Sequence, residues 1–214
     1  INTYANYSIS YKPIGINVGG LPTANGAVLT ELAEVRPEAV NYYEIGIKTN
    51  PTRNSILNFN IYLNDIKDYQ TQVQTPEPGV NRGYLANAEK VQVKGFELDG
   101  SLNIGYFLRI NGAFAYTDAK YKKFTNAPVP LEEVGGPQAF KDISGEVLPG
   151  VSKWAWSLGA EANKGGKLIG INGSYFVAAD VFYRSKFSSS SSPSQFLNID
   201  AYALLNARVG FKGS

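Results

Sequence analysis

The sequence predicts an all-β protein of about eight long antiparallel strands, arranged as a transmembrane β-barrel. Three observations predict this fold: long stretches of alternating apolar and polar residues, connections that are alternately long and short, and an abundance of tyrosine, phenylalanine and glycine, with 14 Tyr, 11 Phe and 22 Gly in 214 residues. Strands of roughly 10 residues cross a bilayer at the tilt of a barrel, whereas strands of soluble sheets average about five or six.

The first four predicted strands cover residues 3–12, 39–49, 57–70 and 89–102. Each has one apolar parity, made by Ala5, Tyr7, Ile9 and Tyr11, then by Tyr43, Ile45 and Ile47, then by Leu57, Phe59, Ile61 and Leu63. In the fourth strand the apolar residues change from odd positions (Val91, Val93) to even positions (Phe96, Leu98) around Gly95. A change of parity with a glycine predicts a β-bulge at that residue.

The last four predicted strands cover residues 107–117, 152–162, 167–177 and 199–211. Their apolar parities are made by Leu108, Ile110, Phe114 and Tyr116, by Trp154, Trp156 and Leu158, by Ile169, Ile171, Tyr175 and Val177, and by Leu205, Ala207, Val209 and Phe211. Trp154 and Trp156 fit an interfacial aromatic girdle, with a sugar-stacking platform as the alternative.

The connections are sorted by length. Long loops are predicted after the first strand, at 74–87, at 118–151 and around the serine-rich segment FSSSSSPSQ (187–195), which we expect to be a mobile loop. Short turns are predicted at TNPTRNS (49–55), NIGY (103–106) and NKGGK (163–167). Membrane barrels alternate long external loops with short periplasmic turns.

Polarity decides which face of each strand meets lipid. A soluble barrel would turn Leu57, Phe59 and Ile61 inward, and a membrane barrel would turn them outward. The opposite face carries Asn58 and Asn60. Amides buried in a dry core would each cost about 1–3 kcal/mol if unpaired, whereas a hydrated lumen provides partners. We therefore expect the apolar face to contact lipid.

Composition excludes several classes of function. The chain has no His, Cys or Met, a net charge of +2 and a mean hydropathy of −0.18. Absence of His removes the commonest general base and metal ligand, so we expect no catalytic residues, no metal site and no cofactor. The balanced charge does not favour nucleic acid as a partner. No apolar run reaches the roughly 18 residues of a spanning helix.

Several segments, in order, resemble the C-terminal half of the barrel of TonB-dependent outer-membrane receptors. They are TYANYSISYKPIGIN (3–17), PEAVNYYEIGIKTN (37–50), LNFNIYLNDIKDYQTQ (57–72), VKGFELDGSL (93–102), GAFAYTDAKYKKF (112–124) and DISGEVLPGVSKWAWS (142–157). The resemblance implies a barrel of about 22 strands with a plugged lumen, in the outer membrane of a Gram-negative bacterium. It also implies uptake of a scarce nutrient, such as a ferric siderophore, powered through TonB.

This resemblance sets expectations for the organisation of the chain. Residues 1–214 are expected to form a partial barrel domain that lacks the plug, the earlier strands and the terminal closing strand. The expected partners are outer-membrane lipid, the remainder of the barrel and its plug, TonB through the missing N-terminal part, and a small nutrient ligand.

Four residues of the predicted external loops are candidate ligand contacts: Arg82, Tyr84, Tyr183 and Arg184. Arginine and tyrosine there could meet an anionic ligand through charge and stacking, although such residues are often merely solvated. Two alternatives to the receptor remain open. One is a complete eight-stranded outer-membrane barrel with a structural or adhesive role, and the other is a soluble β-sandwich that binds carbohydrate.

Overall fold

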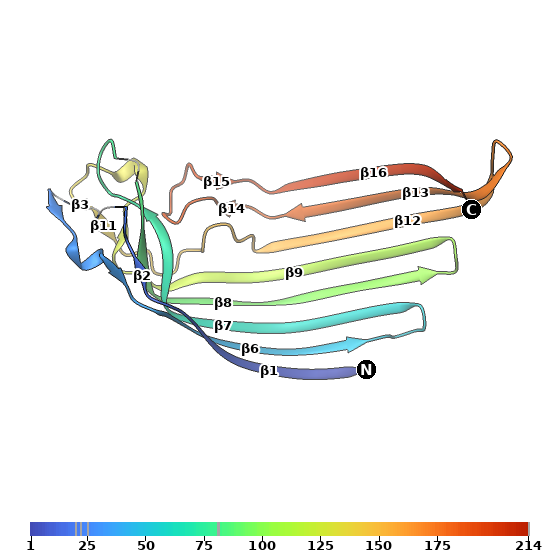
Figure 1. Ribbon diagram of the computed structural model, residues 1–214, viewed down its shortest axis with the longest axis horizontal. Coiled ribbons are helices and arrows are strands. Elements are labelled where there is room, and N and C mark those ends of the chain that lie inside the picture. The colour runs from blue at the N-terminus through green and yellow to red at the C-terminus, as the bar shows by residue number, and fades with distance from the viewer. Residues whose placement is uncertain (20, 22, 25, 81, 214) are drawn as a thin grey trace.

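The structure is a computed structural model that describes residues 1–19, 21, 23–24, 26–80 and 82–213. Eight long strands form one antiparallel sheet in chain order (Figure 1). Their bounds are β1 Asn2–Lys12, β6 Glu38–Thr49, β7 Ser55–Gln74, β8 Gly83–Ile104, β9 Leu108–Lys123, β12 Trp154–Leu168, β13 Ile171–Arg184 and β16 Tyr202–Gly213. The prediction of eight long antiparallel strands is confirmed.

The long connections gather at one end of the sheet, and the short turns and both termini lie toward the other (Figure 1). In their described residues, the connections contain four small two-stranded sheets and two 3₁₀ turns. These are β2 Gly15–Ile16 with β5 Glu34–Val35, β3 Thr23–Ala24 with β4 Ala27–Val28, β10 Ala127–Pro128 with β11 Phe140–Lys141, β14 Phe187–Ser188 with β15 Asn198–Ile199, η1 Thr30–Leu32 and η2 Leu131–Glu133. Within the described ranges, no helix is long and apolar enough to span a membrane.

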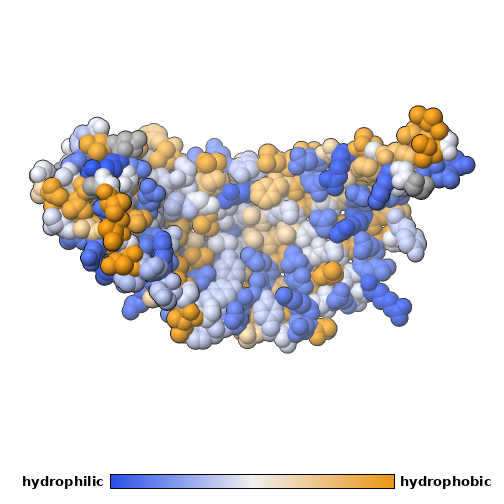
Figure 2. All heavy atoms as spheres, in the orientation of Figure 1, coloured by the Kyte–Doolittle hydropathy of each residue, from blue (hydrophilic) through white to orange (hydrophobic). Residues whose placement is uncertain are grey.

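Along strand β7, within the sheet, the apolar face is the more exposed one. In β7, Leu57, Phe59 and Ile61 are 42%, 40% and 47% exposed, while the intervening Asn58 and Asn60 are half-buried. A soluble sheet would show the opposite pattern. On the face turned to the viewer in Figure 2, hydrophilic residues follow the strands, with hydrophobic ones scattered among them. The exposures agree with the expected outward orientation of Leu57, Phe59 and Ile61.

The polarity of the two faces inverts along the strands. Near the short turns, one register row of the outer face is apolar and consists of Ile45, Ile61, Phe96 and Tyr116. Closer to the long connections, a row on that same face is polar and consists of Asn41, Asp65, Gln92 and Lys120. The next row, on the opposite face, is apolar and consists of Val40, Ile66, Val91 and Tyr121.

The predicted β-bulge at Gly95 is wrong. Gly95 pairs with Tyr62 on one side and Thr117 on the other, and the register is unbroken from Val91 to Ile104. The irregularity between β8 and β9 lies between Lys90 and Val91. The change of parity at Gly95 therefore reflects a change in what surrounds the sheet. Apolar residues face outward between Gly95 and the short turns, and inward between Gly95 and the long connections.

The predicted turn at NKGGK is also wrong. These residues are part of β12, and Leu168 pairs with Ile171, so Ile169 and Gly170 form a two-residue hairpin loop. Both residues have positive φ, 50° and 80°, as a type I′ turn requires. Glycine accepts this conformation readily, but a β-branched residue rarely does. Ile169 is 94% exposed at this tip.

Gly95 is required by close packing. The Tyr62 ring lies over Gly95, and its hydroxyl hydrogen-bonds the Thr117 hydroxyl at 3.0 Å. A Cβ on Gly95 would stand 2.8 Å from the Tyr62 hydroxyl and would overlap the Tyr116 carbonyl. An aromatic side chain that covers a strand glycine in this way helps to fix the register.

We expect Gly95→Ala to lower the free energy of unfolding by about 1–3 kcal/mol through overpacking. Gly165→Ala is the matched control, because a Cβ on this strand residue would meet nothing within 4 Å. Urea unfolding of the two variants in lipid vesicles measures the difference. Equal stabilities would contradict the packing role of Gly95.

Candidate functional site

The long connections fold onto an apolar core beyond the inversion of polarity. Strands β7 and β8 continue together to Gln74 and Gly83. They carry Val73, Tyr84 and Val91 into a cluster with Tyr121 and Phe124, and none of these five is more than 5% exposed. Partners from the connection between β9 and β12 are Ala127, Ile143 and Leu148. The end of the sheet that carries the long connections is thus a packed layer that can hold side chains in place.

Two of the four sequence-predicted ligand contacts, Arg82 and Tyr84, lie beside this core. Arg82 directly precedes β8, and its guanidinium donates to the Leu21 carbonyl at 2.7 Å. Tyr84 lies within β8 and is 5% exposed. Burial raises the pKa of the Tyr84 hydroxyl, and this hydroxyl has no hydrogen-bond partner in the described part of the chain.

The other two candidates, Tyr183 and Arg184, end strand β13 instead of lying in a loop. Tyr183 stacks on Trp156, with ring centroids 5.5 Å apart. The Arg184 guanidinium donates to the Ser152 hydroxyl at 3.1 Å and to the Gly150 carbonyl at 2.8 Å. The loop location expected for Tyr84, Tyr183 and Arg184 is wrong, because the strands extend further than the alternation predicted. Their role as ligand contacts stays a prediction.

Aromatic side chains form a cluster on the outer face of the neighbouring strands. The Trp154 ring lies 4.5 Å from Tyr116 and 5.6 Å from Phe114, measured between centroids. The Tyr7 and Tyr43 rings stack at 4.9 Å further along the sheet. Aromatic residues at this depth, next to the inversion of polarity, fit an interfacial girdle better than a sugar platform.

The polar face carries a hydrogen-bonded network around Glu44. Its carboxylate accepts from the Tyr4 hydroxyl at 2.5 Å, the Tyr42 hydroxyl at 2.7 Å and the Asn60 amide at 3.1 Å. On the same face, toward the other edge of the sheet, Arg208 lies 3.8 Å from Glu161 and 3.7 Å from Asp180. Such a face suits a wet interior, where charges and amides are partnered.

The structure describes no group of three or more acidic residues placed to hold a metal ion within residues 1–19, 21, 23–24, 26–80 and 82–213. Two larger cavities open among the external connections, with volumes of about 610 and 490 Å³. Both have walls from the serine-rich segment, including Ser190, Ser191 and Ser194. Sequence reasoning missed these cavities because their walls come from segments far apart in the chain.

Glu89 ties the connection after β9 to β8. Its carboxylate accepts from the Thr125 hydroxyl at 2.5 Å and the Thr125 amide at 3.2 Å, and Lys123 lies 3.9 Å away. Partial burial opposes ionisation, but these partners outweigh it and lower the pKa of Glu89. A carboxylate with a lowered folded-state pKa stabilises above its unfolded pKa, and this stabilisation is lost as the pH falls through the folded value.

We therefore expect the connection after β9 to become more sensitive to protease as the pH falls below about 4, the unfolded pKa of a glutamate. Glu89→Gln should weaken this dependence on pH. Part of it should remain, because the Ser144 hydroxyl and amide lower the pKa of Asp142 in the same connection. Limited proteolysis with an acid-active protease across pH 3–6 measures the effect. An unchanged pH profile for Glu89→Gln would exclude this role of Glu89.

These features define a class of protein. The sheet has exposed apolar side chains on one face and a hydrogen-bonded polar face opposite. It has short turns at one end and folded connections at the other. This combination is typical of the wall of a transmembrane β-barrel. The profile of the family described as TonB dependent receptor-like, beta-barrel, matches residues 1–213. The chain belongs to this family.

Solved structures agree on the fold. The ferric yersiniabactin uptake receptor FyuA from Yersinia pestis is 18% identical, with a TM-score of 0.66 over 99% of this chain and 27% of that one. The siderophore receptor PiuA from Acinetobacter baumannii is 19% identical, with a TM-score of 0.63 over 98% and 27%. BauA, the ferric preacinetobactin receptor of the same organism, is 14% identical, with a TM-score of 0.64 over 99% and 27%.

The chain spans about a quarter of the length of these three structures. None of the curated protein sequences compared with it matches.

Proposed function

We propose that the chain forms part of the wall and external loops of an outer-membrane transporter that takes up a scarce nutrient, such as a ferric siderophore, in a Gram-negative bacterium. The observation that carries the proposal is the family match over residues 1–213. FyuA, PiuA and BauA, which share the fold, are described as receptors for ferric chelates or siderophores, and this supports a ferric siderophore as the kind of nutrient.

In this proposal the apolar face contacts lipid, and the polar face lines the lumen opposite a plug domain. The remainder of the barrel pairs with β1 and β16, which are the two ends of the described sheet and do not pair with each other within it. TonB supplies energy through a part of the transporter outside this chain. The chain contributes no catalysis.

Two structural observations favour this proposal over the alternatives. A complete eight-stranded barrel requires β1 to pair with β16, and an open sheet order favours a larger barrel. A soluble β-sandwich would bury Leu57, Phe59 and Ile61 between its sheets, but these side chains are exposed. Arg82, Tyr84, Tyr183 and Arg184 remain proposed ligand contacts.

Deletion of the gene that encodes the transporter tests the proposal. Under iron limitation, the deletion strain should lose uptake of at least one ⁵⁵Fe-labelled chelate, and an intact copy of the gene should restore it. Deletion of tonB, or collapse of the proton gradient, should abolish the restored uptake. Uptake that persists without TonB would refute the mechanism. If every iron chelate enters the deletion strain normally, the proposed nutrient class is wrong.

A further inference from the structure

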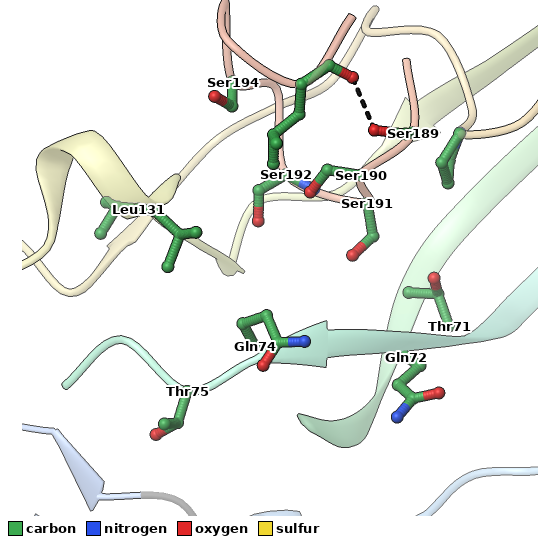
Figure 3. A pocket seen from close by; sticks show the side chains of 13 residues that line it. Thr71, Gln72, Gln74, Thr75, Leu131, Ser189, Ser190, Ser191, Ser192 and Ser194 are labelled. Atoms are coloured by element: carbon green, nitrogen blue, oxygen red, sulfur yellow. Dashed lines mark hydrogen bonds between the residues drawn. The ribbon is translucent and has the colours of Figure 1, made fainter. Parts of the chain in front are cut away.

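The larger external cavity, of about 610 Å³, lies between the end of β7 and the serine-rich segment (Figure 3). Thr71, Gln72, Gln74 and Thr75 form one wall, and residues 189–192 lie across from them. Leu131 borders the space at the side (Figure 3). A volume of this size is within the range of sites that enclose a small molecule.

The lining of this cavity is polar but uncharged. Of its thirteen residues, nine carry a hydroxyl or carboxamide group and four are apolar, and none is charged. Hydroxyl and carboxamide groups both donate and accept hydrogen bonds. A fully charged ligand would lose its hydration there without gaining an opposite charge, which is costly.

The serine-rich segment, for which the composition predicted a mobile loop, contains several internal hydrogen bonds. The Ser190 amide donates to the Ser188 hydroxyl at 3.2 Å, and the Ser192 amide donates to the Ser190 hydroxyl at 3.1 Å. Both the amide and the hydroxyl of Ser189 donate to the Leu197 carbonyl at 2.8 Å. Hydrogen bonds within the segment therefore place its side chains at one wall of the cavity.

One lining group is a buried hydroxyl without a partner. Thr75 is 2% exposed, and its hydroxyl has no hydrogen-bond partner in the described part of the chain. An unpaired buried hydroxyl is unfavourable unless binding provides a partner. The hydroxyl oxygen of Thr75 is enclosed by the protein at the cavity wall, so a ligand reaches it when this wall opens locally and then gains a hydrogen bond at no loss of an internal one.

No charged side chain of the described residues lines the cavity, but the Glu132 carboxylate lies at its margin, where it accepts from the Gln195 amide at 3.2 Å and interacts with the Ser194 side chain. The second cavity shares Ser190, Ser191 and Ser194 with the first and has Lys153 and Lys186 in its wall. Arg82 and Arg184 line neither cavity and already donate to oxygen atoms of the protein. The described lining of the larger cavity thus supplies hydrogen bonds without supplying a positive charge for an anion.

We propose that the larger cavity binds an uncharged ligand, or the uncharged part of one, that presents hydroxyl or amide groups. This inference rests on the proposed function and specifies the chemistry of the nutrient. A sugar and a neutral chelate built on a peptide or hydroxamate scaffold both offer this chemistry. A ferric tris-catecholate, which carries several negative charges, does not.

Binding to the purified whole receptor in detergent tests the proposal with three probes. They are a neutral ferric trihydroxamate, a neutral disaccharide and an anionic ferric tris-catecholate. Thr75→Val removes the hydroxyl at constant shape and should leave the fold intact, because it removes an unpaired polar group. Gln74→Glu places a charge in the uncharged wall. Matched controls are Thr3→Val on β1 and Gln138→Glu outside this cavity.

We expect one neutral probe to bind, and Thr75→Val and Gln74→Glu each to weaken it about tenfold, while both controls bind as the wild type does. Which neutral probe binds distinguishes a sugar from a chelate. Binding of the anionic probe alone, binding of no neutral probe, or full binding by both cavity variants would overturn the proposal. If TonB-dependent uptake persists in that case, only the ligand chemistry fails, and the proposed function stands.

Discussion

Replacing Phe59 with arginine is expected to lower the free energy of unfolding by about 2–4 kcal/mol, the cost of a cation on the lipid face near the bilayer midplane. Phe59 is 40% exposed on the apolar face, and its ring lies 6.1 Å from that of Phe96. The register row of Phe59 lies between those of Leu57 and Ile61, on the short-turn side of the row at which polarity inverts.

Asn60→Arg is the matched control on the polar face of the same strand. The Asn60 amide donates to Glu44 at 3.1 Å and to Glu97 at 3.4 Å, so an arginine there would have carboxylates beside it and a wet surrounding. Its effect should be within about 1 kcal/mol. Reversible urea unfolding in lipid vesicles measures both variants. If Asn60→Arg were the more destabilising, the assignment of the two faces would be reversed.

Replacing Phe124 with alanine is expected to cost the external layer about 3–5 kcal/mol, the usual cost of truncating a buried phenylalanine. Phe124 is 1% exposed, and its ring lies 5.2 Å from that of Tyr121. The change creates a cavity in the core that joins β8, β9 and the connection between β9 and β12. Hydrogen exchange should therefore rise in residues 124–150, because local opening becomes easier.

Leu131→Ala is the control, since Leu131 belongs to the same connection but is 64% exposed. Both variants should keep the folded sheet, because Phe124 lies beyond the membrane-spanning rows. Hydrogen-exchange mass spectrometry resolves the two regions. Faster exchange throughout β7, β8 and β9 would show that the external core supports the whole sheet and is not a separable layer.

The sequence predicted the strands well because two faces of opposite polarity leave a period of two along each strand. It also predicted the orientation, since Asn58 and Asn60 would lack partners in a dry core. The prediction from the sequence was wrong where the alternation continued but the buried face of the sheet changed. The parity change at Gly95 indicated a bulge, but the backbone is regular and the surroundings change. The glycines of NKGGK indicated a turn, yet the chain turns at Ile169 and Gly170.

The candidate site was harder to predict, and the reason is physical. Tyr84 was predicted to lie in a loop because nothing local shows that β7 and β8 continue together beyond the membrane. The larger cavity brings Thr75, Leu131 and Ser191 together from three separate connections. Such proximity depends on packing and not on the spacing of residues in the chain. The unpaired hydroxyl of Thr75 could not be inferred from any motif.

The inversion of polarity has a consequence for engineering and for natural variation. One register row marks its level across five strands, through Asn6, Glu44, Tyr62, Gly95 and Thr117. On the side of the long connections, apolar side chains are buried in a core, as in a water-soluble protein. On the side of the short turns, apolar side chains face outward, as in a membrane protein. Chimeras with junctions at this row should exchange ligand preference between relatives without disturbing membrane insertion. Junctions placed nearer to the short turns would join lipid-facing surfaces that do not match.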